Sequence, residues 1–512
     1  MPDAEENPTF DEHERLSDEL ASRRRNLERL KEWGINPWGE RFITTDRASE
    51  LHELFGTKTA EELAADPREI HLSGRLVAHR IHGKAAFADL LDSTGTIQLF
   101  LKYDILIDKK AAESQNAPNQ WELLEALNLG DWVGVAGTLM KTRTGELTIR
   151  VSEWRILSKA LRPLPEKYHG LKDKELRYRY RYLDLIANPE IRGVFLARTK
   201  VVKAIRRTLD ERGFFEVTTP TLHKIAGGAT ARPFTTHLNA LDIELHLRIA
   251  LELHLKRLMI GGFDRVYEIG PVFRNEGMDR DHNPEFTMLE VYEAFGDLET
   301  MCDLTEAIVR GTCIEVRKGT VTSFRDMELD FGPAFARKDF NELMIEYAGV
   351  NLEPTRDVPS LRRICKEKGL EVEDKASAGR LIDVIFDALV QPNLVQPTFV
   401  FNHPIEFSPL ARMHPTRPGF VQRFELFIAC HEIANAFTEL NDPDDQRARF
   451  EAQALLRATG DEEAHPFDED FLYAMEHGMP PAGGMGLGVD RLVMLVTGAH
   501  SIRDVIFFPM MR

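Results

Sequence analysis

The sequence predicts an α+β protein in which a small β-barrel precedes a larger domain of mixed helices and strands. Residues 68–157 contain short β-rich segments that are separated by turn residues. Residues 181–512 combine long amphipathic helices with strands and show no internal repeat. A chain of 512 residues is long enough for two or three domains, so these two regions are expected to be separate domains.

Composition and charge exclude several classes of protein. The 65 Lys and Arg residues against 83 Asp and Glu give a net charge of −18, which argues against a protein that coats nucleic acid indiscriminately. A nucleic-acid partner held by local basic patches remains possible. No apolar run approaches the ~18 residues of a membrane span, and the acidic N-terminus "MPDAEENPTFDEHE" lacks the apolar core of a signal peptide. A cytoplasmic protein without membrane contact is therefore expected.

Residues 1–67 are expected to form a helical extension, with an amphipathic helix over 12–33 that ends at Gly34. Two segments concentrate basic residues: "SRRRNLERLK" at 22–31 and "KDKELRYRYRY" at 172–182. Each is as consistent with a solvated helix face as with a patch that binds nucleic acid.

Residues 68–157 carry five predicted strands with one helical interruption near 105–127, a pattern that suits a small Greek-key barrel of the OB type. Such barrels often bind single-stranded nucleic acid by stacking bases on aromatic side chains. "AHRIHGKA" at 78–85 imitates a nucleotide-binding P-loop. Ala85, however, replaces the hydroxyl residue that would hold magnesium, so no nucleotide site is predicted there. A linker rich in Pro and charge is expected over 158–180.

Residues 279–290, "DRDHNPEFTMLE", invite interpretation as a calcium loop. Asp279, Asp281, Asn283 and Glu290 match positions one, three, five and twelve of the EF-hand pattern. Position six of that pattern must turn with positive φ, whereas Pro284 is fixed at about −65°. The flanking segments "RVYEIG" and "FTMLEVYEAF" are typical of strands rather than helices. Another role for these residues is therefore favoured.

Strand alternation predicts a charged cleft instead. Three segments place polar and aromatic side chains on one strand face each: Phe286, Met288, Glu290 and Tyr292; Arg274 and Glu276; and Asn435, Phe437 and Glu439. Charged groups at strand positions need partners or solvent, and a surface hairpin explains the aromatic members poorly. Glu425 and Glu432 lie nearby in sequence and are the oxygen ligands that magnesium requires at a phosphate site.

The segment "PPAGGMGLGVDRLVML" places four glycines, at 483, 484, 486 and 488, before a helix that is expected to start near Asp490 and Arg491. A glycine-rich turn that opens a helix lets the backbone approach a nucleotide. Glycine turns are also common without any ligand, so this segment alone does not decide the question.

Together these segments resemble the motifs of class II aminoacyl-tRNA synthetases. A helix is expected over 195–212, with Val201, Ile205 and Leu209 on one face, and a strand "FFEVTTP" that stops at Pro220. This helix and strand, ending in "FFEVTTPTL", resemble motif 1, "FRNEG…HNPEFTMLE" resembles motif 2, and "GLGVDRLVML" resembles motif 3. "HNPEFT", "FTELNDP" and "SIRDVIFFPMMR" narrow the resemblance to the lysyl-tRNA synthetase family, over about residues 15–512. The resemblance implies an OB-fold anticodon-binding domain, followed by a catalytic domain built on an antiparallel sheet flanked by helices.

The resemblance further implies ATP-dependent activation of L-lysine to lysyl-adenylate and transfer to tRNA(Lys), by a homodimer that uses Mg²⁺. The implied ATP-binding residues are Arg274, Glu276, His282, Asn283, Phe286 and Arg491, of which Arg274 and Arg491 are catalytic. The implied lysine-binding residues are Gly228, Glu252, Glu290, Tyr292, Asn435, Phe437 and Glu439, with Glu290, Tyr292 and Glu439 around the ε-ammonium. The implied magnesium ligands are Glu425 and Glu432, and the implied anticodon contacts are Arg80, Phe87 and Gln98.

Three positions depart from the pattern that the resemblance implies. Asp281 stands where many bacterial members carry a basic residue, Leu251 where a proline is common, and Cys430 where a turn glycine is frequent. For Phe87, a place in the barrel core is the alternative.

Two other functions compete with this prediction. An aspartyl- or asparaginyl-type synthetase would need cationic or amide partners for its substrate. A non-catalytic tRNA-binding paralogue usually loses the motif arginines or the metal carboxylates, which are present here.

Overall fold

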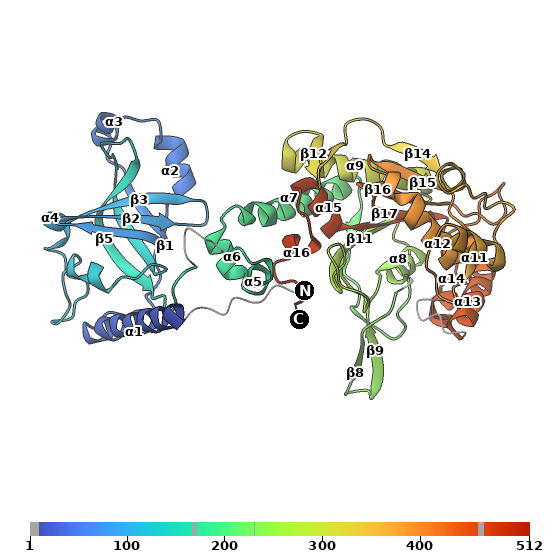
Figure 1. Ribbon diagram of the computed structural model, residues 1–512, viewed down its shortest axis with the longest axis horizontal. Helices are drawn as coiled ribbons and strands as arrows, with labels where there is room; N and C mark the ends of the chain where they lie inside the picture. Colours follow the sequence, from blue (N-terminus) through green and yellow to red (C-terminus); the bar gives the residue numbers. More distant parts are fainter. Residues whose placement is uncertain (1–9, 166–170, 230, 459–464, 512) are drawn as a thin grey trace. The chain divides into compact units, whose positions relative to one another are not determined.

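The computed structural model describes residues 10–165, 171–229, 231–458 and 465–511, and it divides into two compact units, Met1–Leu171 and Lys172–Arg512 (Figure 1). No helix within the described ranges is both long enough and apolar enough to cross a membrane.

The first unit is a closed five-stranded barrel in the order β1-β2-β3-β5-β4, as the sequence predicts (Figure 1). Its strands are β1 (Glu69–His82), β2 (Ala85–Leu91), β3 (Thr96–Lys102), β4 (Trp132–Lys141) and β5 (Leu147–Ser158). Its helices are α1 (Phe10–Glu32), α2 (Ala48–Phe55), α3 (Ala60–Ala65), α4 (Tyr103–Leu106) and the 3₁₀ turn η1 (Glu122–Ala126). The P-loop look-alike is the hairpin between β1 and β2, where Gly83 turns with φ of 58°.

Helix α1 is joined to the barrel by a buried arginine. Arg23 is 2% exposed and donates hydrogen bonds to the carbonyl oxygens of Leu129 and Ala160, at 2.9 and 3.0 Å. Leu27 and Leu30 are buried on the same helix. At least one residue of the basic segment 22–31 therefore serves the fold.

The second unit is built on an eight-stranded sheet in the order β14-β15-β16-β17-β18-β11-β10-β6. Neighbours are antiparallel except at the two edges, where β14 runs parallel to β15 and β6 runs parallel to β10. The central strands are β10 (Arg265–Phe273), β11 (Glu285–Ala294), β16 (Arg423–Ile428), β17 (His431–Thr438) and β18 (Ala482–Gly488), and the outer strands are β6 (Phe215–Glu216), β14 (Ala336–Asp339) and β15 (Thr398–Phe401). This is the antiparallel sheet that the sequence resemblance implies.

Two smaller sheets accompany the large one. One is the hairpin of β12 (Val321–Phe324) and β13 (Met327–Asp330), and the other has the order β7-β9-β8. Its strands are β7 (Leu222–His223), β8 (Thr235–Leu238) and β9 (Ile243–Leu247).

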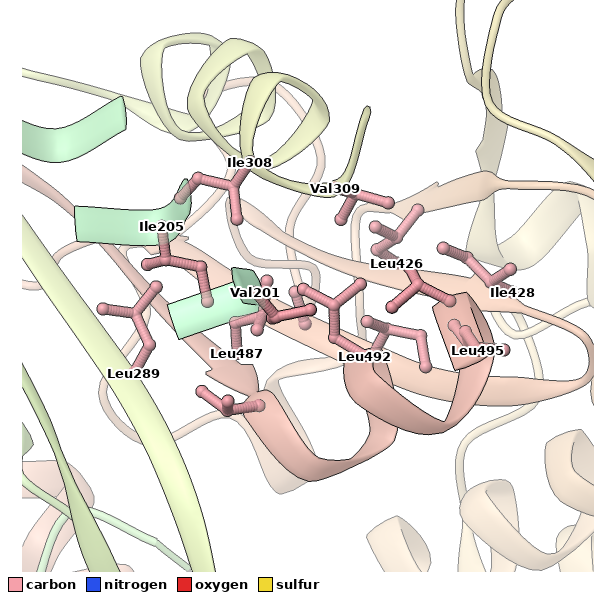
Figure 2. Close-up of a cluster of buried hydrophobic side chains, with 14 of the residues drawn as sticks. Val201, Ile205, Leu289, Ile308, Val309, Leu426, Ile428, Leu487, Leu492 and Leu495 are labelled. Carbon is pink, nitrogen blue, oxygen red and sulfur yellow. The ribbon is translucent and has the colours of Figure 1, made fainter. Parts of the chain in front are cut away.

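Helices α7 (Ile191–Asp210), α9 (Leu298–Arg317) and α15 (Val489–Thr497) pack against one face of the large sheet (Figure 2). The shared core contains Val201 and Ile205 from α7, Leu492 from α15, and Leu289 and Leu487 from the strands. Because strand side chains alternate, residues 288, 290 and 292 of β11 point to the opposite face.

The remaining helices surround the sheet. They are α5 (Lys174–Arg179), α6 (Arg181–Ala187), α8 (Glu252–Ile260), α10 (Phe340–Leu343), α11 (Val358–Glu367), α12 (Ala378–Leu389), α13 (Pro443–Ala458), α14 (Glu469–Met475) and α16 (Ile502–Val505), with the short turns η2 (Met344–Ala348), η3 (Gln391–Asn393) and η4 (Ile405–Phe407).

The second basic segment is also used inside the fold. Arg181 is 1% exposed and binds Asp184 and the carbonyl oxygens of Arg503 and Phe507, while Tyr178 donates to Asp504 at 2.9 Å. These bonds attach α5 and α6 to the C-terminal segment.

Three sequence-based expectations differ from the structure. The strand predicted at "FFEVTTP" is reduced to the two residues of β6. Strand β10 ends at Phe273, so Arg274 and Glu276 lie in the loop that follows it rather than on a strand face. The glycine-rich segment is the strand β18 rather than a turn.

Candidate functional site

A cavity of about 360 Å³ lies on the sheet face opposite the helical core. β11 contributes Phe286, Met288, Glu290 and Tyr292, so the predicted alternation is confirmed. Of the residues implied for ATP, lysine and magnesium, all line this cavity except Glu439. The cavity is therefore the place where the motifs converge.

At one end of the cavity, an arginine lies over an aromatic ring. The Arg274 guanidinium carbon is 5.2 Å from the centroid of the Phe286 ring, and Nε donates to the carbonyl oxygen of Ile249 at 3.4 Å. Burial lowers the pKa of Arg274, and the nearby carboxylates of Glu276 and Glu432 oppose that change. This end of the cavity carries a fixed positive charge and an aromatic face.

A second arginine reaches the same region from the first turn of α15. Arg491 donates to the carbonyl oxygen of Glu432 at 2.7 Å and to Nε2 of His282 at 3.0 Å. Since arginine can only donate, Nε2 of His282 accepts and its Nδ1 carries the proton that faces Asp279 at 2.9 Å. The His282 ring is therefore held between Arg491 and Asp279.

The loop before β11 does not have the geometry of an EF-hand calcium loop. Asp279 Oδ1 accepts hydrogen bonds from the backbone N–H groups of Asp281 and His282, at 2.6 and 2.8 Å, and so closes the loop on itself. Glu290 lies well inside β11 and faces the cavity. Within the described ranges, no group of three or more His, Cys, Asp or Glu side chains is arranged to hold a metal ion.

At the other end of the cavity, a buried carboxylate accepts two hydrogen bonds. Glu290 is 3% exposed, and its oxygens accept from the Leu251 N–H at 2.8 Å and the Tyr292 hydroxyl at 3.1 Å. Burial and the charge of Glu252 raise the pKa of Glu290 to about 7. The departure at Leu251 has a consequence here, because a proline would lack this N–H donor.

A lysine of the protein, Lys256, neutralises part of this acidic end. Lys256 Nζ is fully buried on α8 and forms ion pairs with Glu252 and Glu439. Burial alone would lower the pKa of Lys256, but the two carboxylates raise it overall. Burial raises the pKa of Glu439 to about 8 in spite of Lys256.

Glu439 is the site residue that the structure keeps away from the cavity surface. β17 ends at Thr438, and Glu439 is 0% exposed behind Tyr292 and Gly484. Sequence reasoning missed its partner Lys256, although the spacing of Glu252 and Lys256 by four residues on a helix is a recognisable signal.

The glycines of β18 make room for the side chains of the neighbouring strands. Gly484 pairs with Tyr292 on one side and with Phe437 on the other, and a Cβ at Gly484 would collide with Tyr292 and Glu439. A Cβ at Gly486 would meet Met288. Glycine is therefore needed at these positions because a larger side chain would not fit, and not because the backbone turns there.

Two further carboxylates face the cavity from the hairpin of β16 and β17. Arg423 forms an ion pair with Glu425 and donates to Asn435 Oδ1 at 2.9 Å. Burial and the charge of Glu432 raise the pKa of Glu425 to about 8, although Arg423 lowers it. Because the charge of Glu432 raises the pKa of Glu425, a cation between the two carboxylates would be stabilised.

The backbone of the hairpin between these strands explains why glycine is frequent at the position of Cys430. Ala429 and Cys430 form its turn with φ of 52° and 62°. A residue with a Cβ adopts this left-handed conformation at a cost of roughly 1–2 kcal/mol, which is why glycine is favoured at such positions.

Arg198 connects α7 to two cavity segments and was not predicted. It forms an ion pair with Asp490, next to Arg491, and donates to Thr287 Oγ1 at 2.8 Å, next to Phe286. Arg198 lies three residues before Val201, on the apolar face of α7. A charged residue on such a face is the signal that could have revealed its role.

On the barrel, the implied anticodon residues lie on one outer surface. Arg80 pairs across strands with Phe87, and Asp89 with Gln98. Phe87 is half-buried outside the barrel core, so the core alternative is wrong. Phe100, whose ring centroid is 5.1 Å from that of Phe87, adds a second aromatic that alternation from Gln98 could have predicted.

Comparison with known proteins identifies both units. Residues 173–512 match the family model described as tRNA synthetases class II (D, K and N), and residues 70–157 match that of the OB-fold nucleic acid binding domain. The chain is 50% identical over 496 residues to a lysine–tRNA ligase of Moorella thermoacetica, a match that covers 97% of this chain and 98% of the relative. It is 48% identical over 500 residues to the lysine–tRNA ligase of Bacillus subtilis, covering 98% of each chain. With motifs, sheet and cavity in agreement with this match, the chain belongs to the lysine–tRNA ligase family of class II tRNA synthetases.

Proposed function

We propose that the protein activates L-lysine with ATP to form lysyl-adenylate and transfers the lysyl group to the 3′ end of tRNA(Lys). The observation that carries this proposal is a single cavity with a buried acidic end and a cationic, aromatic end. The acidic end suits the ammonium groups of lysine, and the cationic end suits the phosphates and base of ATP.

The charge of the acidic end supports lysine as the substrate. When ionised, Glu252, Glu290 and Glu439 carry three negative charges against one positive charge on Lys256, an excess of two. Lysine brings two ammonium groups, on its α and ε carbons. Their entry would favour ionisation of carboxyls whose pKa burial has raised, because a buried charge needs an opposite charge beside it.

The roles within the lysine pocket follow from position in the cavity. Glu290 and Tyr292 are proposed to bind the ε-ammonium directly, with Glu439 acting through Lys256. The α-ammonium group is proposed to lie near Gly228 and Glu252. Asn435 would assist the substrate carboxylate, and Phe437 would flank the methylene chain.

The ATP end is proposed to work by placement and charge neutralisation. Arg274 would bridge the α-phosphate and the lysine carboxylate, which holds the reacting atoms in line. Phe286 offers a surface for the adenine ring, with Glu276 and Asn283 near it. His282 and Arg491 are joined by a hydrogen bond and would contact the outer phosphates.

Glu425 and Glu432 fit a magnesium ion that arrives with ATP. Both face the cavity, and magnesium is commonly held by one or two carboxylates together with substrate phosphates. When bound, the ion would neutralise charge on the phosphate oxygens.

An aspartyl- or asparaginyl-type substrate is less well supported. Such a side chain would bring a carboxylate or amide next to Glu290, which is buried and acidic. A non-catalytic role is also less well supported, because Arg274, Arg491 and both hairpin carboxylates line the cavity.

The activity is tested by ATP–pyrophosphate exchange with each of the twenty amino acids in separate reactions. We expect exchange with lysine to exceed that with every other amino acid, because lysine alone supplies two ammonium groups on a long apolar chain. Preference for aspartate or asparagine, or exchange with no amino acid, would contradict the proposal.

For the barrel, we propose that Arg80, Phe87 and Gln98 contact the anticodon of tRNA(Lys). Phe87 presents a ring on the outer surface, and Gln98 Oε1 is held by the Thr148 hydroxyl at 2.9 Å. An aromatic face can stack on a base while an oriented amide reads its edge.

Phe87→Ala and Gln98→Ala are each expected to weaken aminoacylation of tRNA(Lys) while leaving exchange without tRNA unchanged. Loss of a stacking contact costs about 1–3 kcal/mol, or roughly a tenfold to hundredfold loss in kcat/KM for tRNA. Trp132→Ala is the matched control, since Trp132 is an exposed aromatic (39%) on β4 of the same barrel. If both reactions fell equally in the Phe87 variant, the barrel residue would have a structural role only.

A homodimer is proposed as the assembly, and the cytoplasm as the place of the reaction. Two exposed apolar side chains support the dimer: Phe215 on the edge strand β6 is 62% exposed, and Leu196 on α7 is 61% exposed. A second copy of the chain would cover them.

A further inference from the structure

Two carboxylates that line the cavity, Asp281 and Asp490, have no part in the proposed function, and Asp490 forms an ion pair with Arg198. Asp281 lines the cavity beside His282, at the end proposed for the outer phosphates of ATP. A carboxylate there would repel a triphosphate unless its charge were cancelled.

A cation from a distant segment pairs with this carboxylate. Arg325 stands in the turn between β12 and β13 and forms an ion pair with Asp281 through Nη2. The same guanidinium donates to the carbonyl oxygen of His500 at 2.7 Å and to Nε2 of His431 at 2.9 Å. Its side chain is only 10% exposed, so the pair is largely shielded from solvent.

The backbone of this turn is held in an unfavourable conformation. Arg325 and Asp326 have φ of 47° and 67°, and neither is a glycine. Residues with a Cβ persist in the left-handed region only where the surrounding contacts enforce it. The bonds of the Arg325 side chain supply such contacts.

The loop that carries Asp281 is fixed independently at its other points. The carbonyl oxygen of Arg280 accepts hydrogen bonds from the backbone N–H of Ile502 at 2.9 Å and from the hydroxyl of Ser501 at 3.2 Å. His282 is held by Asp279 and Arg491. The loop therefore does not depend on Arg325 alone for its position, which leaves charge as the main contribution of Arg325.

We propose that Arg325 is a charge-compensating residue for ATP binding, which cancels the negative charge of Asp281 at the phosphate end of the cavity. This inference rests on the proposed function for the identity of the ligand. It differs from a purely structural role in a way that can be measured. If Arg325 only pinned the loop, Asp281→Asn and Arg325→Ala would break the same link and weaken ATP binding equally.

The test is a double-mutant cycle on the full chain with the wild type, Asp281→Asn, Arg325→Ala and the double variant. The dissociation constant of Mg·ATP is measured by calorimetry without lysine, and the KM values of ATP and lysine are measured by exchange. Arg325→Gly is a second variant, because glycine relieves the left-handed turn and keeps the fold. Asp326→Asn is the matched control, since Asp326 is exposed on the same turn.

We expect Arg325→Ala and Arg325→Gly to weaken ATP binding by about tenfold, with less than a twofold change in the KM of lysine. Asp281→Asn alone should bind ATP as tightly as the wild type or more tightly. Without Arg325, Asp281 keeps only the longer contacts to Arg280 at 3.7 Å and His431 at 3.5 Å. In the double variant, removal of this under-compensated carboxylate should restore ATP binding to within about threefold of the wild type. Asp326→Asn should change neither constant.

A double variant that binds ATP as weakly as Arg325→Ala would overturn the inference, as would unchanged ATP binding in both Arg325 variants. The proposed function is judged separately, by lysine-dependent exchange in the wild type. A wild type that binds ATP and follows the cycle but exchanges no pyrophosphate with lysine would contradict the proposed function alone. A wild type that does not bind ATP would overturn both.

Discussion

In the exchange assay, Arg274→Ala is expected to abolish lysine activation while the protein keeps its fold. Arg274 follows β10 directly, and its backbone N–H donates to the carbonyl oxygen of Pro284 at 2.9 Å. Its two Nη groups form no hydrogen bond within the described part of the chain and face the cavity. Attack of the lysine carboxylate on the α-phosphate builds up charge on the phosphate oxygens, and we propose that these groups donate to those oxygens. Loss of one such donor costs ~3 kcal/mol or more in the transition state, about a hundredfold in rate.

Two variants distinguish this effect from a general loss of structure. Arg274→Lys keeps the charge but not the two-pronged donor, so an intermediate rate is expected. Arg362→Ala removes an arginine of α11 that donates to the carbonyl oxygens of Glu373 and Asp374, away from the cavity, and should exchange normally. Near-normal exchange in an Arg274→Ala protein with an unchanged circular dichroism spectrum would refute the role of Arg274.

The fold was largely predictable because its signals are local. The five barrel strands are separated by turn residues, and the apolar face of α7 repeats at helical spacing through Val201, Ile205 and Leu209. The strand at "FFEVTTP" was overestimated, because β propensity does not determine how many residues find a partner at the sheet edge. The glycines of β18 suggest a turn when only their own segment is considered. They are needed because side chains of the neighbouring strands leave no room for a Cβ, and the sequence of β18 does not show this.

The site was predictable where one strand carries several of its residues. Alternation along β11 places four side chains in the cavity without knowledge of any other segment. Contacts between distant segments could not be predicted in this way. The pair of Lys256 with Glu439 spans 183 positions (439 − 256), and that of Arg325 with Asp281 joins a surface hairpin to the cavity. Such pairs form only because the fold brings distant segments together, and no periodic pattern in a single sequence indicates which segments will meet.

Glu290→Gln is expected to raise the KM of lysine strongly, with little change in the KM of ATP. The glutamine keeps the shape of the side chain and can still accept from Leu251 N–H, whose bond to Glu290 is 2.8 Å long. It removes one negative charge from a pocket where Glu290 is 3% exposed, so a lysine ammonium would be under-neutralised. A loss of several kcal/mol at most is expected in lysine binding.

The pH dependence of the KM of lysine provides an independent check on the role of Glu290. Burial and Glu252 raise the pKa of Glu290 to about 7, so the carboxyl gains a proton and loses its charge as pH falls below that value. In the wild type, the KM of lysine should therefore rise between pH 8 and pH 6, by up to about tenfold per pH unit. Glu439, whose pKa burial raises to about 8, titrates in the same range. Glu290→Gln should accordingly reduce this slope without removing it.

Discrimination between substrates separates a charge effect from a loss of packing. Norleucine has an apolar chain of similar length but no ε-ammonium, so it gains nothing from the charge of Glu290. In exchange at saturating ATP, Glu290→Gln should lower kcat/KM for lysine far more than for norleucine. Met288→Leu, a change of similar volume on the same strand face, is the matched control and should keep the wild-type ratio between the two. If a folded Glu290→Gln protein kept the lysine KM, its pH slope and the preference over norleucine, Glu290 would not be the partner of the ε-ammonium, and the acidic end of the cavity would owe its charge to Glu252 and Glu439 alone.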